Sequence, residues 1–175
     1  MTNPNKSKVH TFALKGAAAL AITALFTAAL LFTGCSDGSG GGSGSSSIEG
    51  VWRVVSTQKN SEVPETYPET QPGGSTLQPY FCFLEGKVYV AAKIEVAGDP
   101  ENSGLFKGSP WNKPYAFANS ILTIEGQSES FIINVSGNTA TATISDSSGT
   151  GVITLNRVSS PTVEQIKAAK TAPTP

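Results

Sequence analysis

The sequence is poor in the side chains that most often carry chemistry. It has one histidine, His10, and two cysteines, Cys35 and Cys82, in 175 residues. The histidine precedes an apolar run that we interpret below as a removable export signal, so the exported chain would contain no imidazole. This inventory excludes structural zinc sites, Ser-His-Asp triads and Cys-His catalysis. We therefore expect no enzyme activity, no metal site and no cofactor.

Acidic residues are also missing from the start of the chain, where the first is Asp37. In their place Lys6, Lys8 and Lys15 precede residues 16–35, which read GAAALAITALFTAALLFTGC. A basic start, an apolar run and small residues before a cleavage point are typical of an export signal. The alternative is an uncleaved transmembrane helix, because the run is just long enough to span a bilayer.

The end of this run, LFTGC at residues 31–35, resembles the lipobox of bacterial lipoproteins. The resemblance implies that Cys35 is lipidated and that the signal peptide, residues 1–34, is removed. Residues 35–47 would then be a lipidated cysteine with a flexible Gly/Ser tether. The implied partner is a membrane, either the cell membrane or the outer membrane, with the protein facing the periplasm or the cell surface.

Removal of the signal changes the charge balance of the chain. Three of its 12 basic residues precede Cys35, whereas all 13 acidic residues follow it, so the exported chain has a net charge of −4 before the termini are counted. A mildly acidic chain without a basic patch argues against nucleic acid as a partner. With Cys35 taken by lipid, Cys82 has no disulfide partner, so the domain is not a disulfide scaffold.

After the tether, apolar residues recur with the period of two that indicates half-buried strands. We predict eight strands and no helix between them, which favours an antiparallel sandwich or barrel over residues 48–160. Thr162 and Gln165 form a capping-box pattern, which predicts a short helix within residues 161–175 before a disordered tail. The eight predicted strands are Val51–Thr57, Gln78–Leu84, Lys87–Val96, Pro114–Ala118, Ile121–Glu125, Ser130–Val135, Thr139–Ser145 and Val152–Val158.

Three connections between these strands are short enough for two-residue hairpin loops: Glu85-Gly86, Asn119-Ser120 and Gly137-Asn138. Pairing outward from each loop places apolar residues opposite one another on one face, so register and burial agree. The other connections are longer, and in an up-and-down meander they gather at the opposite end. We therefore expect a barrel with a tight base and a mouth ringed by the loops at residues 58–77 and 97–113.

The first predicted strand contains Gly50 and Trp52, and the last ends with Arg157. These three residues resemble the G-x-W motif and the packing arginine of lipocalin-like (calycin) barrels. The resemblance implies an all-β, eight-stranded antiparallel up-and-down barrel with these residues closing its base; an unrelated barrel of the streptavidin type is the alternative. Strand alternation independently points Arg157 inward, where Trp52 is the available cation–π partner.

Trp111 is the residue hardest to assign to packing, because it lies in a Pro-bounded stretch with aromatic neighbours. It is either part of an apolar binding rim at the barrel mouth or part of a loop that plugs the barrel. Small inward residues such as Ala140 and Ala142 leave room for a guest, although the phenylalanines opposite can lean into that room. The candidate ligand-binding residues are Phe81, Phe83, Phe106, Trp111, Tyr115 and Phe117.

Two function hypotheses remain from the sequence. The first is a lipid-anchored binding protein whose barrel holds a small apolar or amphipathic molecule. The second is a surface-exposed lipoprotein with a solid barrel core that binds an unknown protein partner through its long loops. Asp99, Glu101 and Asn102 are the closest cluster of possible calcium ligands. Because they lack the EF-hand spacing, we interpret them as solvated charged and polar residues of a loop.

Overall fold

A computed structural model describes residues 47–146 and 149–172 of the chain. The predicted signal peptide, Cys35 and the tether up to residue 46 lie outside the described residues. Within the described part of the chain, no helix is both long enough and apolar enough to cross a membrane.

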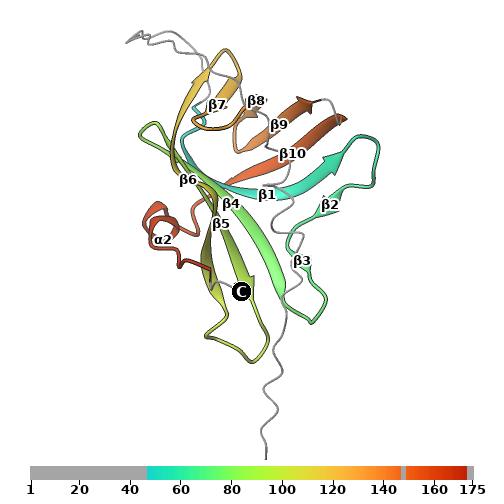
Figure 1. The fold of residues 1–175 in the computed structure, drawn as a ribbon, viewed down its shortest axis with the longest axis vertical. Coiled ribbons are helices and arrows are strands. Elements are labelled where there is room, and N and C mark those ends of the chain that lie inside the picture. The colour runs from blue at the N-terminus through green and yellow to red at the C-terminus, as the bar shows by residue number, and fades with distance from the viewer. Residues whose placement is uncertain (1–46, 147–148, 173–175) are drawn as a thin grey trace, which may run out of the picture.

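Eight antiparallel strands close into a barrel, as the sequence predicts (Figure 1). The first barrel strand, β1, pairs with β10 along one edge and with β4 along the other, which closes the ring. Two short strands, β2 and β3, extend the edges of β1 and β4, and one short helix, α2, follows β10. The elements are β1 Gly50–Lys59, β2 Glu65–Thr66, β3 Glu69–Thr70, β4 Thr76–Leu84, β5 Lys87–Glu95, β6 Gly104–Ala118, β7 Ile121–Ile124, β8 Ser130–Ser136, β9 Thr139–Asp146, β10 Gly149–Val158 and α2 Val163–Lys167.

The three predicted hairpins are confirmed in both loop and register. Phe83 lies opposite Val88 on β4 and β5, and the β6–β7 and β8–β9 pairs likewise have the expected partners. At the β6–β7 turn Asn119 and Ser120 have φ values of 51° and 64°, the left-handed pair that a type I′ hairpin turn requires. The start of β1 and the end of β10 lie at the same end as these turns, since Gly50 is opposite Phe83 near the β4–β5 turn and Asn156 is opposite Thr139 at the β8–β9 turn.

One prediction about the strands is wrong. Strand β6 begins at Gly104 rather than at Pro114 and is 15 residues long, so the supposed loop at residues 97–113 is mostly strand. Its residues from Gly104 to Pro114 pair with β5, and the register shifts near Tyr89. Glycine and proline interrupt the alternation there, which hides the strand from a sequence pattern. Pro110 lies between Lys107 and Trp111, where the register with β5 shifts, and proline is tolerated at such a bulge because no ladder N–H is needed there.

Away from the base, the wall divides into two directions (Figure 1). Strand β1 pairs with β4 only from Gly50 to Arg53, whereas it stays with β10 as far as Lys59. Where β1 and β4 part, the buried Gln78 side chain donates from Nε2 to the Val54 carbonyl at 2.8 Å. This bond takes the place of a ladder hydrogen bond at the point where the ladder stops.

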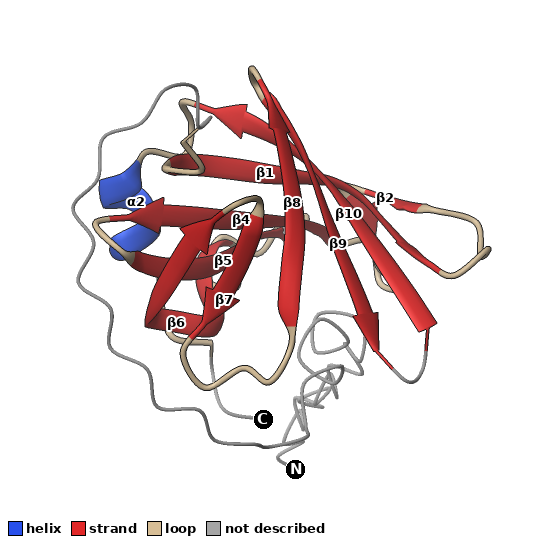
Figure 2. Cartoon of the chain, turned by 90° about the horizontal axis from the view of Figure 1, so that it is seen from above, coloured by secondary structure: helices blue, strands red, loops and turns tan. Residues whose placement is uncertain are grey.

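Apolar side chains form two separate clusters. The larger one fills the barrel and includes Trp52, Phe83 and Ile133. The second lies on the outside of β4 and β5, beside which α2 lies in Figure 2. There Ile166 of α2 packs with Cys82 and Tyr89. The predicted capping box between Thr162 and Gln165 is present. The helix ends at Lys167, after which Lys170 forms a bridge with Phe106 of β6.

Candidate functional site

The base of the barrel is built around Arg157, as the resemblance implied. Its guanidinium carbon lies 4.3 Å from the centre of the fully buried Trp52 ring. The two terminal nitrogens of the guanidinium donate to the backbone carbonyls, Nη1 to that of Glu49 and Nη2 to that of Ser47 at 2.7 Å. The inward arginine is thus satisfied by an aromatic face and two backbone acceptors, which offsets its desolvation.

The segment before β1 closes this end of the barrel. Ile48 is 2% exposed and belongs to the barrel core, and its carbonyl accepts a 2.6 Å hydrogen bond from Trp52 Nε1. Glu49 accepts a bond from the Tyr115 hydroxyl at 3.2 Å. Burial, with the nearby Glu49 carboxylate, raises the pKa of Tyr115 to about 12. Sequence reasoning missed this plug, although Ile48 is the one apolar side chain between the Gly/Ser tract and the first strand.

The barrel interior is occupied by its own side chains. Phe81 and Phe83 stack with centroids 6.3 Å apart, and Tyr115 meets Phe83 edge to face at 5.2 Å. The small residues expected to leave room, Ala140 and Ala142, are only 3% and 5% exposed and belong to the same cluster. Phe117 packs against this cluster as well. Four predicted ligand residues, Phe81, Phe83, Tyr115 and Phe117, therefore meet inside the barrel as packing partners.

Trp111 does not lie at the mouth, and it does not plug the barrel, so both expectations for it are wrong. It packs edge to face on Tyr89 at 5.3 Å, on the outer wall, with Lys107 Nζ 5.2 Å from its ring. The reason is the strand character of β6, which places Trp111 opposite Tyr89 rather than in a loop. The aromatic group that the sequence assigned to one rim is therefore divided between the inside and the outside of the wall.

Phe106 also lies on β6 rather than in a loop. It is buried opposite Ala92 of β5, and Lys170 Nζ lies 5.7 Å from its ring. The backbone of Lys170 holds the C-terminal segment to this strand, because its N–H donates to the Leu105 carbonyl at 2.8 Å and its carbonyl accepts from Lys107. A ligand-binding role for Phe106 stays a prediction.

Cys82 is fully buried beneath α2, beside its cross-strand partner Tyr89, as the outward alternation of β4 predicts. Burial raises the pKa of the thiol to about 11. A protonated, covered thiol is a poor nucleophile. The residue acts as a small apolar side chain in the outer cluster.

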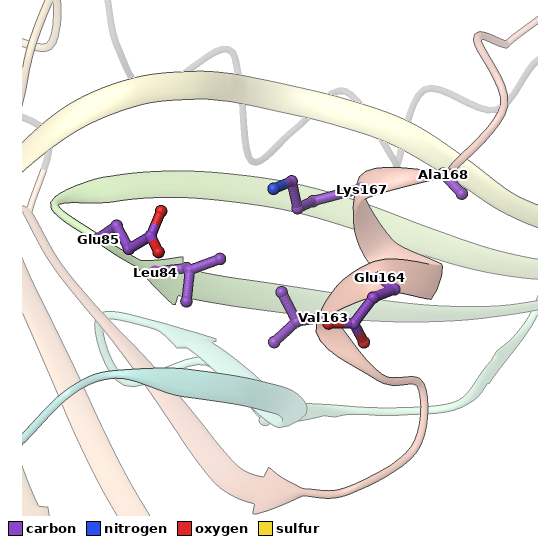
Figure 3. A pocket seen from close by; sticks show the side chains of 6 residues that line it. All are labelled: Leu84, Glu85, Val163, Glu164, Lys167 and Ala168. Atoms are coloured by element: carbon purple, nitrogen blue, oxygen red, sulfur yellow. The ribbon is translucent and has the colours of Figure 1, made fainter.

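A shallow, open hollow lies outside the barrel, between α2 and the β4–β5 hairpin (Figure 3). Leu84, Val163 and Ala168 give it apolar walls, and Glu85 and Glu164 add carboxylates. Figure 3 shows that these side chains come from the β4–β5 hairpin and from α2. The hollow offers little burial to a small molecule, so we assign it no binding role.

The acidic loop residues make a turn rather than a metal centre. Asp99 accepts hydrogen bonds from the backbone N–H of Asn102 at 3.1 Å and from its side chain at 2.7 Å. These bonds hold the pKa of the Asp99 carboxyl below its ordinary value. Over residues 47–146 and 149–172, no three His, Cys, Asp or Glu side chains are grouped as a metal ion would need.

Comparison of the chain with protein-family models, with curated proteins and with solved structures found no match. Any proposal about function therefore depends on the sequence and on the structure of this chain alone.

Proposed function

We propose that this chain is a lipid-anchored, non-enzymatic extracytoplasmic protein with a solid barrel, which works through its outer surface by contacting another protein. The observation that carries the proposal is the continuous packing of the barrel interior. Ala140 and Ala142, the positions where a guest would need space, are buried among aromatic and aliphatic neighbours. Eight strands enclose a space that either side chains or one small ligand can fill, and here side chains occupy it.

The position of the tether supports the anchoring part of the proposal. Ser47, where the Gly/Ser tract ends, is held by Arg157 at the base of the barrel. A lipid on Cys35 would therefore hold the base toward the membrane, and the β1–β2 connection would lie at the far end. That connection carries Val63, which is 88% exposed, an apolar side chain available to a partner.

A ligand-holding barrel is the competing function, and one experiment separates the two. An apolar fluorescent probe is titrated into the full-length processed protein in detergent, with the heat-unfolded protein and the detergent alone as controls. The proposal predicts no saturable binding and no change in tryptophan emission. Saturable one-to-one binding that quenches the buried Trp52 would overturn it in favour of the ligand-holding barrel.

A further inference from the structure

The outer faces of the two halves of the barrel differ sharply in charge. On β5, the outward alternation brings Lys87, Lys93 and Glu95 to the surface. The outward side chains of β7, β8, β9 and β10 are without exception Thr, Ser, Asn, Ile or Val. We call this second surface the lateral face. Its strands lie side by side in Figure 2, and no lysine, arginine, aspartate or glutamate side chain points outward from them.

The lateral face has an apolar centre. Ile121 and Ile132 are cross-strand partners, and they are 47% and 54% exposed. They are two of the three large apolar side chains that are exposed in the described residues. Ala118 lies beside Ile121, and Thr143 lies beside Ile132. A row of uncharged side chains thus crosses adjacent strands, with the isoleucine pair as its most apolar part.

We propose that the lateral face is a homodimer interface, and that its occupant is the lateral face of a second copy of this chain. A two-fold contact places the same surface on both sides, so the surface must be complementary to itself. A charge-free face meets this condition, because no like charges oppose each other and no ion loses its water. The hydroxyls of Thr141 and Thr143 both donate and accept, so identical residues can pair across the contact.

The proposed anchoring favours this occupant over a soluble partner, and the inference rests on the proposed function to that extent. The lateral face belongs to the barrel wall, whereas the tether leaves from the base at Ser47. Copies anchored in one membrane would therefore meet wall to wall. Confinement to one surface raises the effective concentration of such encounters.

Cysteine cross-linking tests the proposal directly, because neither native cysteine would offer an accessible thiol. Cys82 is fully buried, and Cys35 would be lipidated, so a cysteine introduced at the surface is the one accessible thiol. Ile132→Cys places a thiol in the apolar centre of the lateral face. Val63→Cys is the matched control, since it places a thiol at an exposed apolar position in the β1–β2 connection.

Under mild oxidation of intact cells, the proposal predicts a disulfide-linked dimer of Ile132→Cys that is ~10-fold more abundant than that of Val63→Cys. Adding Ile121→Lys to Ile132→Cys should abolish the dimer, because two lysines would then face each other. Equal cross-linking at the two positions, or cross-linking of Ile132→Cys to a different protein, would overturn the proposal.

The same oxidation, repeated on purified full-length protein in detergent, separates this inference from the anchoring. If the protein forms the dimer in detergent but does not fractionate with membranes in the cell, the proposed interface is supported and the proposed anchor is ruled out. A membrane-bound protein that stays monomeric in both settings would reject the interface and leave the anchor standing.

Discussion

Arg157 and Gly50 fit each other at the barrel base. Gly50 has φ of +115°, and a Cβ added to it would lie 3.0 Å from Arg157 Nη1. Glycine is therefore required there for two reasons, the backbone conformation and the approach of the guanidinium. The same arginine covers Trp52 and holds the carbonyls of Ser47 and Glu49. The G-x-W pattern and the distant arginine form one structural unit.

This unit predicts energetic coupling between Trp52 and Arg157. Trp52→Ala should lower the free energy of unfolding by ~3–5 kcal/mol, as a large truncation in a packed core does. Arg157→Ala should cost less on its own, and the double variant should show a coupling of ~0.5–2 kcal/mol from the lost cation–π contact. Denaturant unfolding of the four proteins measures the cycle, and strictly additive effects would mean that the pair does not interact.

The segment before β1 predicts that the barrel core begins at Ile48, directly after the tether. Ile48→Ala should lower the free energy of unfolding by ~2–5 kcal/mol, since it removes a side chain that is 2% exposed. Val63→Ala, at a side chain that is 88% exposed, is the control and should change stability by less than ~0.5 kcal/mol. Thermal or chemical unfolding measures both. Equal stabilities of the two variants would show that Ile48 is not part of the core.

Alkaline pH should weaken the fold through Cys82. The native thiol has its pKa raised from 9.0 to about 11 by burial, so the native state holds this proton more tightly than the unfolded state. The resulting stabilisation is complete below the unfolded value and is lost as the pH rises from about 9 toward 11. The stability of Cys82→Ala should fall less across this window. Tyr67, Tyr80 and Tyr115, whose pKa values are also raised by burial, are present in both proteins, so the difference between the two curves reports mainly on the thiol.

If Cys35 carries the lipid, replacing it should remove the membrane anchor. Cys35→Ala should leave the protein either unprocessed or soluble, because stable anchoring needs acyl chains that the alanine cannot accept. Detergent-phase partitioning and the intact mass of the cell-derived protein measure this. Unchanged partitioning together with an unchanged mature mass would rule out an anchor at Cys35.

The hairpins were predictable because the residues that determine them lie close together in the sequence. A two-residue turn fixes the register, and alternation around Glu85-Gly86 or Gly137-Asn138 then fixes which face is buried. Strand β6 was not predictable, because Gly108 and Pro110 break its alternation while β5 still pairs with it. Because this part of β6 was assigned to a loop, alternation could not show which side of the wall Trp111 faces, and its position was predicted wrongly.

The base shows a second limit of sequence analysis. Arg157 could be paired with Trp52 because both follow from strand alternation and strand order. The hydrogen bonds to Ser47 and Glu49 could not, because the path of the chain before β1 has no periodicity to fix it. The covering of Cys82 by Ile166 was predictable only in outline, as an outward residue that something must cover.

The free energy of unfolding of Ala140→Phe shows whether the barrel interior is solid. Ala140 lies opposite Leu155 and Val135 and is 3% exposed, so a phenylalanine there should overpack the core and cost ~1–3 kcal/mol or more. Ala116→Phe is the control, because it makes the same change at an exposed position on β6. If the barrel is solid, Ala140→Phe will clearly lose stability and Ala116→Phe will lose almost none. An Ala140→Phe protein as stable as the wild type would instead mean that the barrel has an empty interior.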